Sequence, residues 1–139
     1  MKINIDIDVS NCKLDTDEMW KAISQELEKC AYKIERTAKE LVPHEYENTG
    51  ELKRSINTNQ VSDKEFEVST NVEYAHFIED GTTPHTIEGN PFLHWSRDGE
   101  EFIRSSVNHP GNKPYLYMET AMETHASTLA DDIAGAIKL

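Results

Sequence analysis

The side chains best suited to chemistry in this sequence are its histidines, which lie among many acidic residues. A histidine–carboxylate set can bind zinc, and this would make the protein a small metal-dependent hydrolase or nuclease. However, no two histidines stand at i and i+4 on a predicted helix, and neither HExxH nor CxxC occurs. We therefore predict no catalytic residue, no metal and no cofactor, and keep the hydrolase or nuclease as an alternative. The histidines in or near second-half loops are His76, His85, His94 and His109.

Nucleophilic catalysis has no better basis in the sequence. No Gly-x-Ser-x-Gly elbow occurs, and the glycines are spread over separate predicted loops, so no phosphate-binding loop forms. The two cysteines, Cys12 and Cys30, do not make a disulfide framework. Cys30 falls on the apolar stripe of a predicted helix, where it is expected as a small buried hydrophobe.

The stretch from Tyr74 to His85 is the most distinctive in the chain. Tyr74, Phe77 and Ile78 stand at i, i+3 and i+4, which predicts one buried face of a short helix. Gly81 is expected to end that helix with a positive φ. Thr82 and Thr83 can bond the nearby backbone, and Pro84 prevents the helix from resuming.

The rest of the chain predicts one α+β domain over residues 1–139. A small antiparallel sheet packs against a long helix in the N-terminal half and against a C-terminal helix. Asp15 and Glu18 have capping-box chemistry at the start of the long helix, and Asp98-Gly99 predicts a tight hairpin turn. The expected elements are a strand at 2–9, a helix at 16–42, strands at 52–61 and 64–71, a short helix at 72–80, a hairpin at 92–107 and a C-terminal helix at 114–138.

Composition and charge restrict the function further. The 139 residues carry a formal net charge of −12, which argues against a surface that grips nucleic acid through phosphate contacts. The same charge is compatible with a channel wall past which DNA slides without adhesion. We find no signal peptide and no apolar run long enough for a membrane span, so no membrane partner is expected.

Several short runs occur in an order that is similar to a known family. They are Asn48–Ile56, Val72–Thr82, Pro84–Ile87, Val107–Gly111 and Lys113–Leu116. This order, over about residues 30 to 125, resembles the tail-component or neck proteins of long-tailed bacteriophages and prophages. In that family the corresponding runs read TG-x-L-x-x-S-I, YA-x-x-x-E-x-G-T, P-H-x-I, H-P-G and a P-F-L-like entry. Tyr115 stands where phenylalanine is usual.

The resemblance implies a virion structural protein without enzymatic activity, at the neck or in tail completion. It implies self-association into a ring, with a hexamer as one option, only on assembly. The neighbours would be head-completion, tail-completion or tail-tube proteins, with DNA passing through. The location would be the virion, and the host cytoplasm during assembly. The expected interface and structural residues are Tyr74, Phe77, Ile78, Glu79, Gly81, Thr82, Pro84, His109, Pro110 and Gly111.

Further expectations concern surfaces. One contact patch of the ring is expected to include the exposed side of the loop at 79–83. The loops 81–90 and 107–113 are rich in turn formers, so we expect them to be mobile in the free subunit and ordered on assembly. For Phe77 and Trp95 we favour core packing over an interface role. A prophage-encoded module that binds a host protein is a further alternative.

Overall fold

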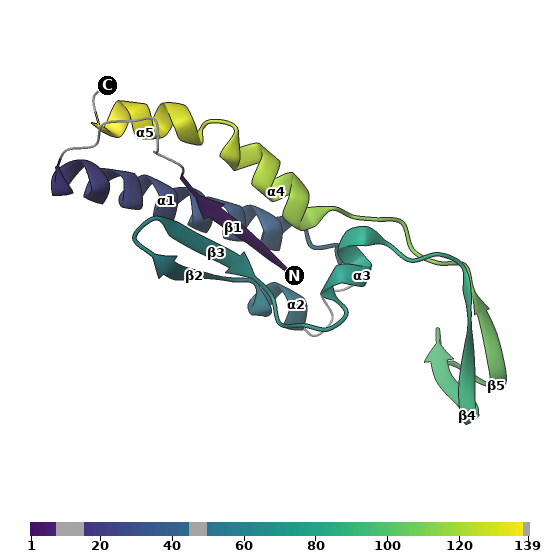
Figure 1. The fold of residues 1–139 in the computed structure, drawn as a ribbon. Coiled ribbons are helices and arrows are strands. Elements are labelled where there is room, and N and C mark those ends of the chain that lie inside the picture. Colours follow the sequence, from purple (N-terminus) through teal and green to yellow (C-terminus); the bar gives the residue numbers. More distant parts are fainter. Residues whose placement is uncertain (8–15, 45–49, 138–139) are drawn as a thin grey trace.

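The computed structural model describes residues 1–7, 16–44 and 50–137 and has an α+β fold, as predicted. Figure 1 shows a body of helices and a small sheet, from which one hairpin projects. The elements in chain order are β1 (Lys2–Asp6), α1 (Asp17–Leu41), α2 (Glu51–Ser55), β2 (Asn57–Ser62), β3 (Glu65–Ser69), α3 (Ala75–Asp80), β4 (His85–Arg97), β5 (Glu100–His109), α4 (Tyr117–Ala126) and α5 (Leu129–Ile137).

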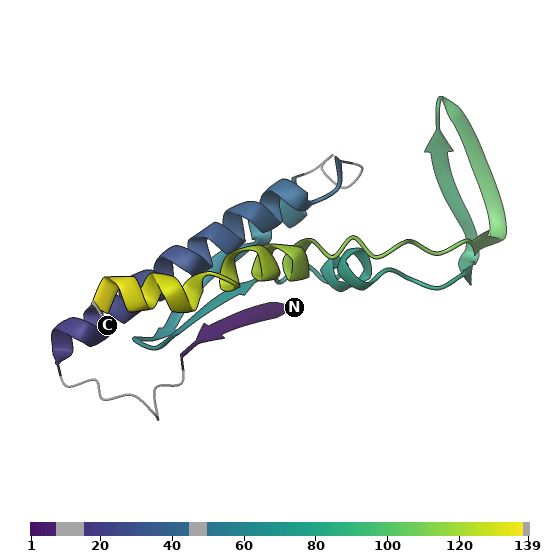
Figure 2. The same cartoon turned by 90° about the horizontal axis from the view of Figure 1, so that it is seen from above.

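Helix α1 is the centre of the body. It packs on the antiparallel sheet, whose strand order is β1-β3-β2, and it also contacts α4 and α5, which run beside it (Figure 2). Its contact face carries small and branched apolar side chains at steps of three and four, as a helix buried on one side requires. The buried residues of α1 are Ile23, Leu27, Cys30, Ala31, Ile34 and Ala38.

The long helix is close to its predicted bounds, but its cap differs. Thr16 is the N-cap, and its hydroxyl accepts a hydrogen bond from the backbone N–H of Met19 at 3.2 Å. The predicted cap, Asp15, lies outside the described residues, as does Cys12. Thr16 satisfies one of the N–H groups that the first turn leaves without a helical partner.

The predicted strand at 52–61 is wrong in its first half, because residues Glu51–Ser55 form the helix α2. Leu52 and Ile56 are both fully buried. Their spacing of four suits one helical turn as well as it suits alternation in a strand, and the tertiary fold selects the helix. Strand β3 lies in the middle of the sheet and buries Phe66 and Val68. The last two residues of the predicted strand 2–9 lie outside the described part.

The C-terminal helix is also different from the prediction of one helix at 114–138. Leu116 has a φ of 51°, so α4 begins only at Tyr117. A turn at Ser127 and Thr128 separates α4 from α5. The Thr128 carbonyl then accepts from the backbone N–H of Asp132 at 3.0 Å, which starts the second helix.

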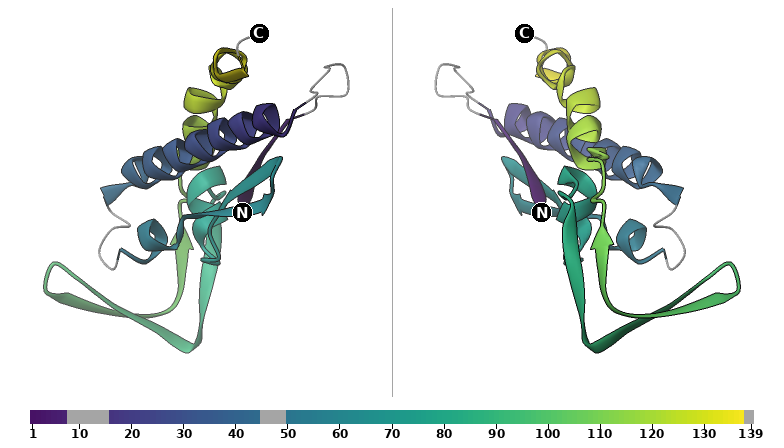
Figure 3. Two further views of the ribbon diagram at one scale, coloured as in Figure 1. Left: turned by 90° about the vertical axis from the view of Figure 1, so that its left-hand side faces the viewer. Right: turned by 90° about the vertical axis from the view of Figure 1, so that its right-hand side faces the viewer.

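Strands β4 and β5 form a hairpin that we call the arm, residues 85–109. The predicted hairpin at 92–107 is too short, because β4 already begins at His85 and β5 continues to His109. The Asp98-Gly99 turn is confirmed, with φ of 52° and 84° at the two positions. The register shifts between Glu88 and Leu93. Figure 3 shows the arm bent along its length.

None of the helices in the described part of the chain has the length and the apolar character of a membrane span.

Candidate functional site

The segment that joins the arm to the body is held by a buried carboxylate. Glu79, in α3, is only 6% exposed. One of its oxygens accepts from the backbone N–H of Met118 and the other from that of Glu119, both at 2.9 Å. These N–H groups belong to the first turn of α4, where no helical partner exists and negative charge is favoured. Glu79 therefore caps α4 from outside, and its expected place on an exposed patch is wrong.

Three further hydrogen bonds fasten α3 to the start of α4. The carbonyls of Ile78 and Glu79 accept from the backbone N–H groups of Tyr115 and Leu116, at 3.1 and 3.2 Å. The hydroxyl of Tyr117 donates to the Ala75 carbonyl at 3.1 Å. Burial raises the pKa of Tyr117 well above its ordinary value, and the nearby charge of Glu79 adds to the effect. Tyr117 thus stays a neutral donor inside the core.

The two chain segments that lead to the arm touch along their backbones. Thr82 and Asn112 exchange backbone N–H···O hydrogen bonds, both 3.0 Å long. The Thr82 hydroxyl also accepts from the Asn112 N–H at 3.0 Å. Gly81 has a φ of 75°, which confirms the predicted positive value. A Cβ at Gly111 would collide with the Thr82 carbonyl. Glycine on both segments is what allows this close approach.

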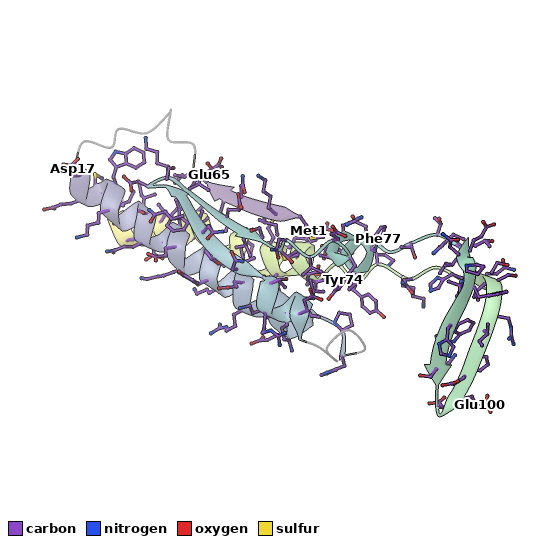
Figure 4. All side chains as sticks on the ribbon, turned by 90° about the horizontal axis from the view of Figure 1, so that it is seen from below. Met1, Asp17, Glu65, Tyr74, Phe77 and Glu100 are labelled. Atoms are coloured by element: carbon purple, nitrogen blue, oxygen red, sulfur yellow. The ribbon has the colours of Figure 1, made fainter. Side chains whose placement is uncertain are left out.

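The predicted buried face of α3 is displaced by one position. Ile78 is buried, as expected, but Tyr74 is 36% exposed and Phe77 49% exposed. Ala75 and Glu79 take their places in the core. A glutamate can be buried there because two backbone N–H groups satisfy its charge. Figure 4 shows Tyr74 and Phe77 at the end of the body from which the arm leaves.

An open groove of about 710 Å³ runs along the base of the arm. Phe77 lies on the body side, and the rings of His85 and His109 lie on the arm side with their centroids 4.9 Å apart. His109 accepts from the Gly111 backbone N–H through Nδ1 at 3.0 Å. The other groove residues are Gly81, Thr82, Thr83, Ile87 and Asn112. Pro84 and Pro110 are exposed beside it.

The histidines do not converge on a reactive centre in the part of the chain described. Among those residues, no group of three or more His, Cys, Asp or Glu side chains is placed to share a metal ion. His76 lies against Phe77, and His94 is 3.7 Å from Glu101 near the arm tip. Cys30 is buried, and burial raises the pKa of its thiol, which disfavours a reactive thiolate.

Sequence reasoning missed the surface of the arm. Trp95, expected in the core, is 37% exposed and stacks on Phe102 across the hairpin at 5.3 Å. Phe92 is 63% exposed and Ile103 59% exposed. The adjacent apolar pairs 92–93 and 102–103 are the signal that could have revealed this. Neighbouring strand residues point to opposite faces, so such pairs place apolar side chains on both sides.

The chain is thus a small α+β protein, and its projecting hairpin exposes the large apolar side chains of Ile87, Phe92, Trp95 and Ile103. Residues 13–81 match the family described as "Bacteriophage HK97-gp10, putative tail-component". The chain belongs to this family of phage tail components, which makes it a viral protein of the virion. Neither the curated proteins nor the solved structures contain a significant match to it.

The family match ends at Gly81, so it covers α1 to α3 and stops just before the Thr82–Asn112 junction. The short runs at 84–87 and 107–111 lie outside the matched residues, so their similarity to the family remains a resemblance in the sequence. The interface role expected of Thr82, Pro84, His109 and Pro110 also stays a prediction.

Proposed function

We propose that this tail component is a subunit of a ring at the head–tail junction, of the neck or tail-completion type, through which DNA passes. The observation that carries the proposal is the arm. A two-stranded hairpin is marginally stable alone in water, and this one exposes Phe92, Trp95 and Ile103. Large apolar side chains gathered on a projecting element are typical of a protein–protein contact. Assembly would cover them.

A ring also fits the asymmetry of the subunit. The arm leaves the body at the α3 end, away from the N-terminus of α1 (Figure 1). If one patch of a subunit binds a different patch of the next subunit, the same contact can repeat from copy to copy. The subunits then close into a ring when the rotation between neighbours is a whole fraction of a full turn. We propose a hexamer as one option, formed only on assembly against a head-completion, tail-completion or tail-tube protein.

The charge of the chain supports passage of DNA without specific binding. A net charge of −12 repels the phosphate backbone, so a channel lined by such subunits would not retain the duplex. Assembly would take place in the host cytoplasm before the virion is complete. No observation in the described residues favours the metal-dependent or host-binding alternatives.

A complementation experiment tests the proposal. The phage lacking this gene is grown in cells that supply the wild-type chain or a variant without the arm. Because His85 and His109 are register partners, an Asn-Gly turn can replace residues 86–108 between them. No arm residue belongs to the core cluster, so the variant should fold.

Wild-type protein should restore infectious particles, whereas the armless variant should leave unjoined heads and tails in electron micrographs. Its denaturation midpoint is measured in parallel to show that the body is intact. If particles lacking the protein are joined normally and infect cells, the neck assignment is wrong. If the folded armless variant restores infection, the arm is not the assembly element.

A further inference from the structure

We infer that the tip of the arm docks on a basic groove in helix α1 of a second copy of this chain. This inference rests on the proposed ring and names the two surfaces that would form its repeating contact. The tip is residues 94–102, and the basic groove is formed by Lys29, Tyr32, Lys33 and Arg36.

The basic groove is unusual for so acidic a protein. Its four residues stand at i, i+3, i+4 and i+7 and so share one face of α1. They line an open hollow of about 370 Å³ around Tyr32, which is 52% exposed. The arrangement places an aromatic ring among three cations on a solvent-facing surface. Such a surface suits a partner that is both acidic and apolar.

Two of these cations form no ion pair with the residues that the structure describes. Lys29 pairs with Glu26 at 3.1 Å. For Lys33 and Arg36, no carboxylate of the described residues lies within 4.0 Å. Burial lowers the pKa of His125, and the charges of Lys33 and then Arg36 lower it further, whereas the charge of Glu40 opposes them by a smaller amount. An incoming carboxylate would therefore gain a favourable charge contact.

The arm tip has the complementary chemistry. Asp98, Glu100 and Glu101 outnumber the single cation Arg97 around the turn. The Asp98 side chain is 94% exposed and that of Glu101 74% exposed. Directly behind the turn lies the stacked pair of Trp95 and Phe102. The tip thus offers carboxylates beside an aromatic pair, whereas the groove offers cations beside Tyr32.

The partner is a second copy because the arm points away from α1 of its own chain. Figure 4 shows Glu100 and Asp17 at opposite ends of the molecule. The two surfaces differ, so their contact is head-to-tail and can propagate around a ring. Burial of the Trp95 and Phe102 rings would stabilise the contact. The complementary charges would select the partner surface and fix how the two surfaces align.

Charge reversal tests this contact in the same complementation assay. The groove variant carries Lys33→Glu and Arg36→Glu, and the tip variant carries Glu100→Lys and Glu101→Lys. Each should lower the yield of infectious particles on the order of tenfold or more, since every 1.4 kcal/mol of lost contact is about tenfold in binding. A chain with all four changes should recover most of the yield, because opposite charges meet again.

Matched controls are Lys21→Glu, exposed on the same helix, and Glu73→Lys, exposed before α3. Both should keep the wild-type yield. Denaturation midpoints are compared for all variants, and Lys33→Gln with Arg36→Gln replaces the groove variant if that one unfolds.

Two outcomes would overturn the proposed contact between the arm tip and the basic groove. Neither would decide the ring proposal, which the armless variant tests separately. In the first, the groove variant matches the Lys21→Glu control. In the second, the four-change chain gives no higher yield of infectious particles than the groove variant. In addition, a gel-shift assay shows that the groove variant, unlike the tip variant, has lost binding to a double-stranded DNA fragment. That result would assign the groove to DNA.

Discussion

Gly81 lies so close to Asn112 that a Cβ on the glycine would come within 2.6 Å of the Asn112 carbonyl oxygen. The two residues flank the base of the arm on opposite chain segments. The backbone of Gly81 has φ 75° and ψ 177°, a conformation that is essentially limited to glycine. This residue therefore satisfies two demands at once, one of backbone conformation and one of space.

We expect Gly81→Ala to lower the free energy of unfolding by about 1–3 kcal/mol or more, because the strain and the collision with Asn112 act together. Chemical denaturation followed by circular dichroism measures it. Gly135→Ala is the control, since a Cβ there meets nothing within 4 Å in helix α5, and alanine should be neutral or stabilising by roughly 0.5–1 kcal/mol. Equal midpoints for Gly81→Ala and wild type would contradict the close approach.

Glu79→Gln should destabilise the protein by about 1–3 kcal/mol. The amide group keeps one acceptor oxygen but turns an NH₂ toward a backbone N–H that Glu79 now satisfies. The charge that stabilises the α4 N-terminus is also lost. Asp80→Asn, on an exposed neighbour, should change stability by no more than about 0.5 kcal/mol. The cap would be refuted by a Glu79→Gln midpoint as high as that of Asp80→Asn.

Phe77 and Ile78 should respond in opposite ways to alanine substitution. Ile78 is 3% exposed, so Ile78→Ala should cost about 2–5 kcal/mol of folding free energy. Phe77 is 49% exposed, and Phe77→Ala should cost about 0.5 kcal/mol or less. A large loss for Phe77→Ala in guanidinium titrations would mean that the ring is buried after all.

Stability should fall as the solution is acidified through the titration of His125. Burial, with Lys33 and Arg36 nearby, holds the pKa of His125 below its ordinary value of 6.5. The unfolded chain then takes up the proton first, so this contribution is present above pH 6.5 and is lost as the pH falls through the folded pKa. His125→Gln should therefore reduce the difference between denaturation midpoints at about pH 7.5 and about pH 5.

No reduction of that difference in His125→Gln would assign the acid sensitivity to other groups. Glutamine is the chosen replacement because it can still bond the Thr37 hydroxyl, which lies 2.6 Å from Nε2 of His125.

Features that depend on neighbours along the chain could be predicted from the amino-acid sequence. The apolar stripe of α1, the alternation in β3, the Asp98-Gly99 turn and the positive φ of Gly81 all follow from local spacing and backbone sterics. The order of the short runs along the chain was also enough to indicate the tail-component family. These features together define the α+β class, because amphipathic elements must bury their apolar faces against one another.

Which side chains of the central stretch are buried depends instead on long-range packing. In isolation, a tyrosine and a phenylalanine are better core candidates than a glutamate. The folded chain buries Glu79 because α4 brings two unpaired N–H groups to its carboxylate from about forty positions away. Phe77 is left on the surface. In the same way, the length of the arm depends on pairing between residues 85–88 and 106–109. Long-range partners of this kind cannot be read from residue types that usually form turns.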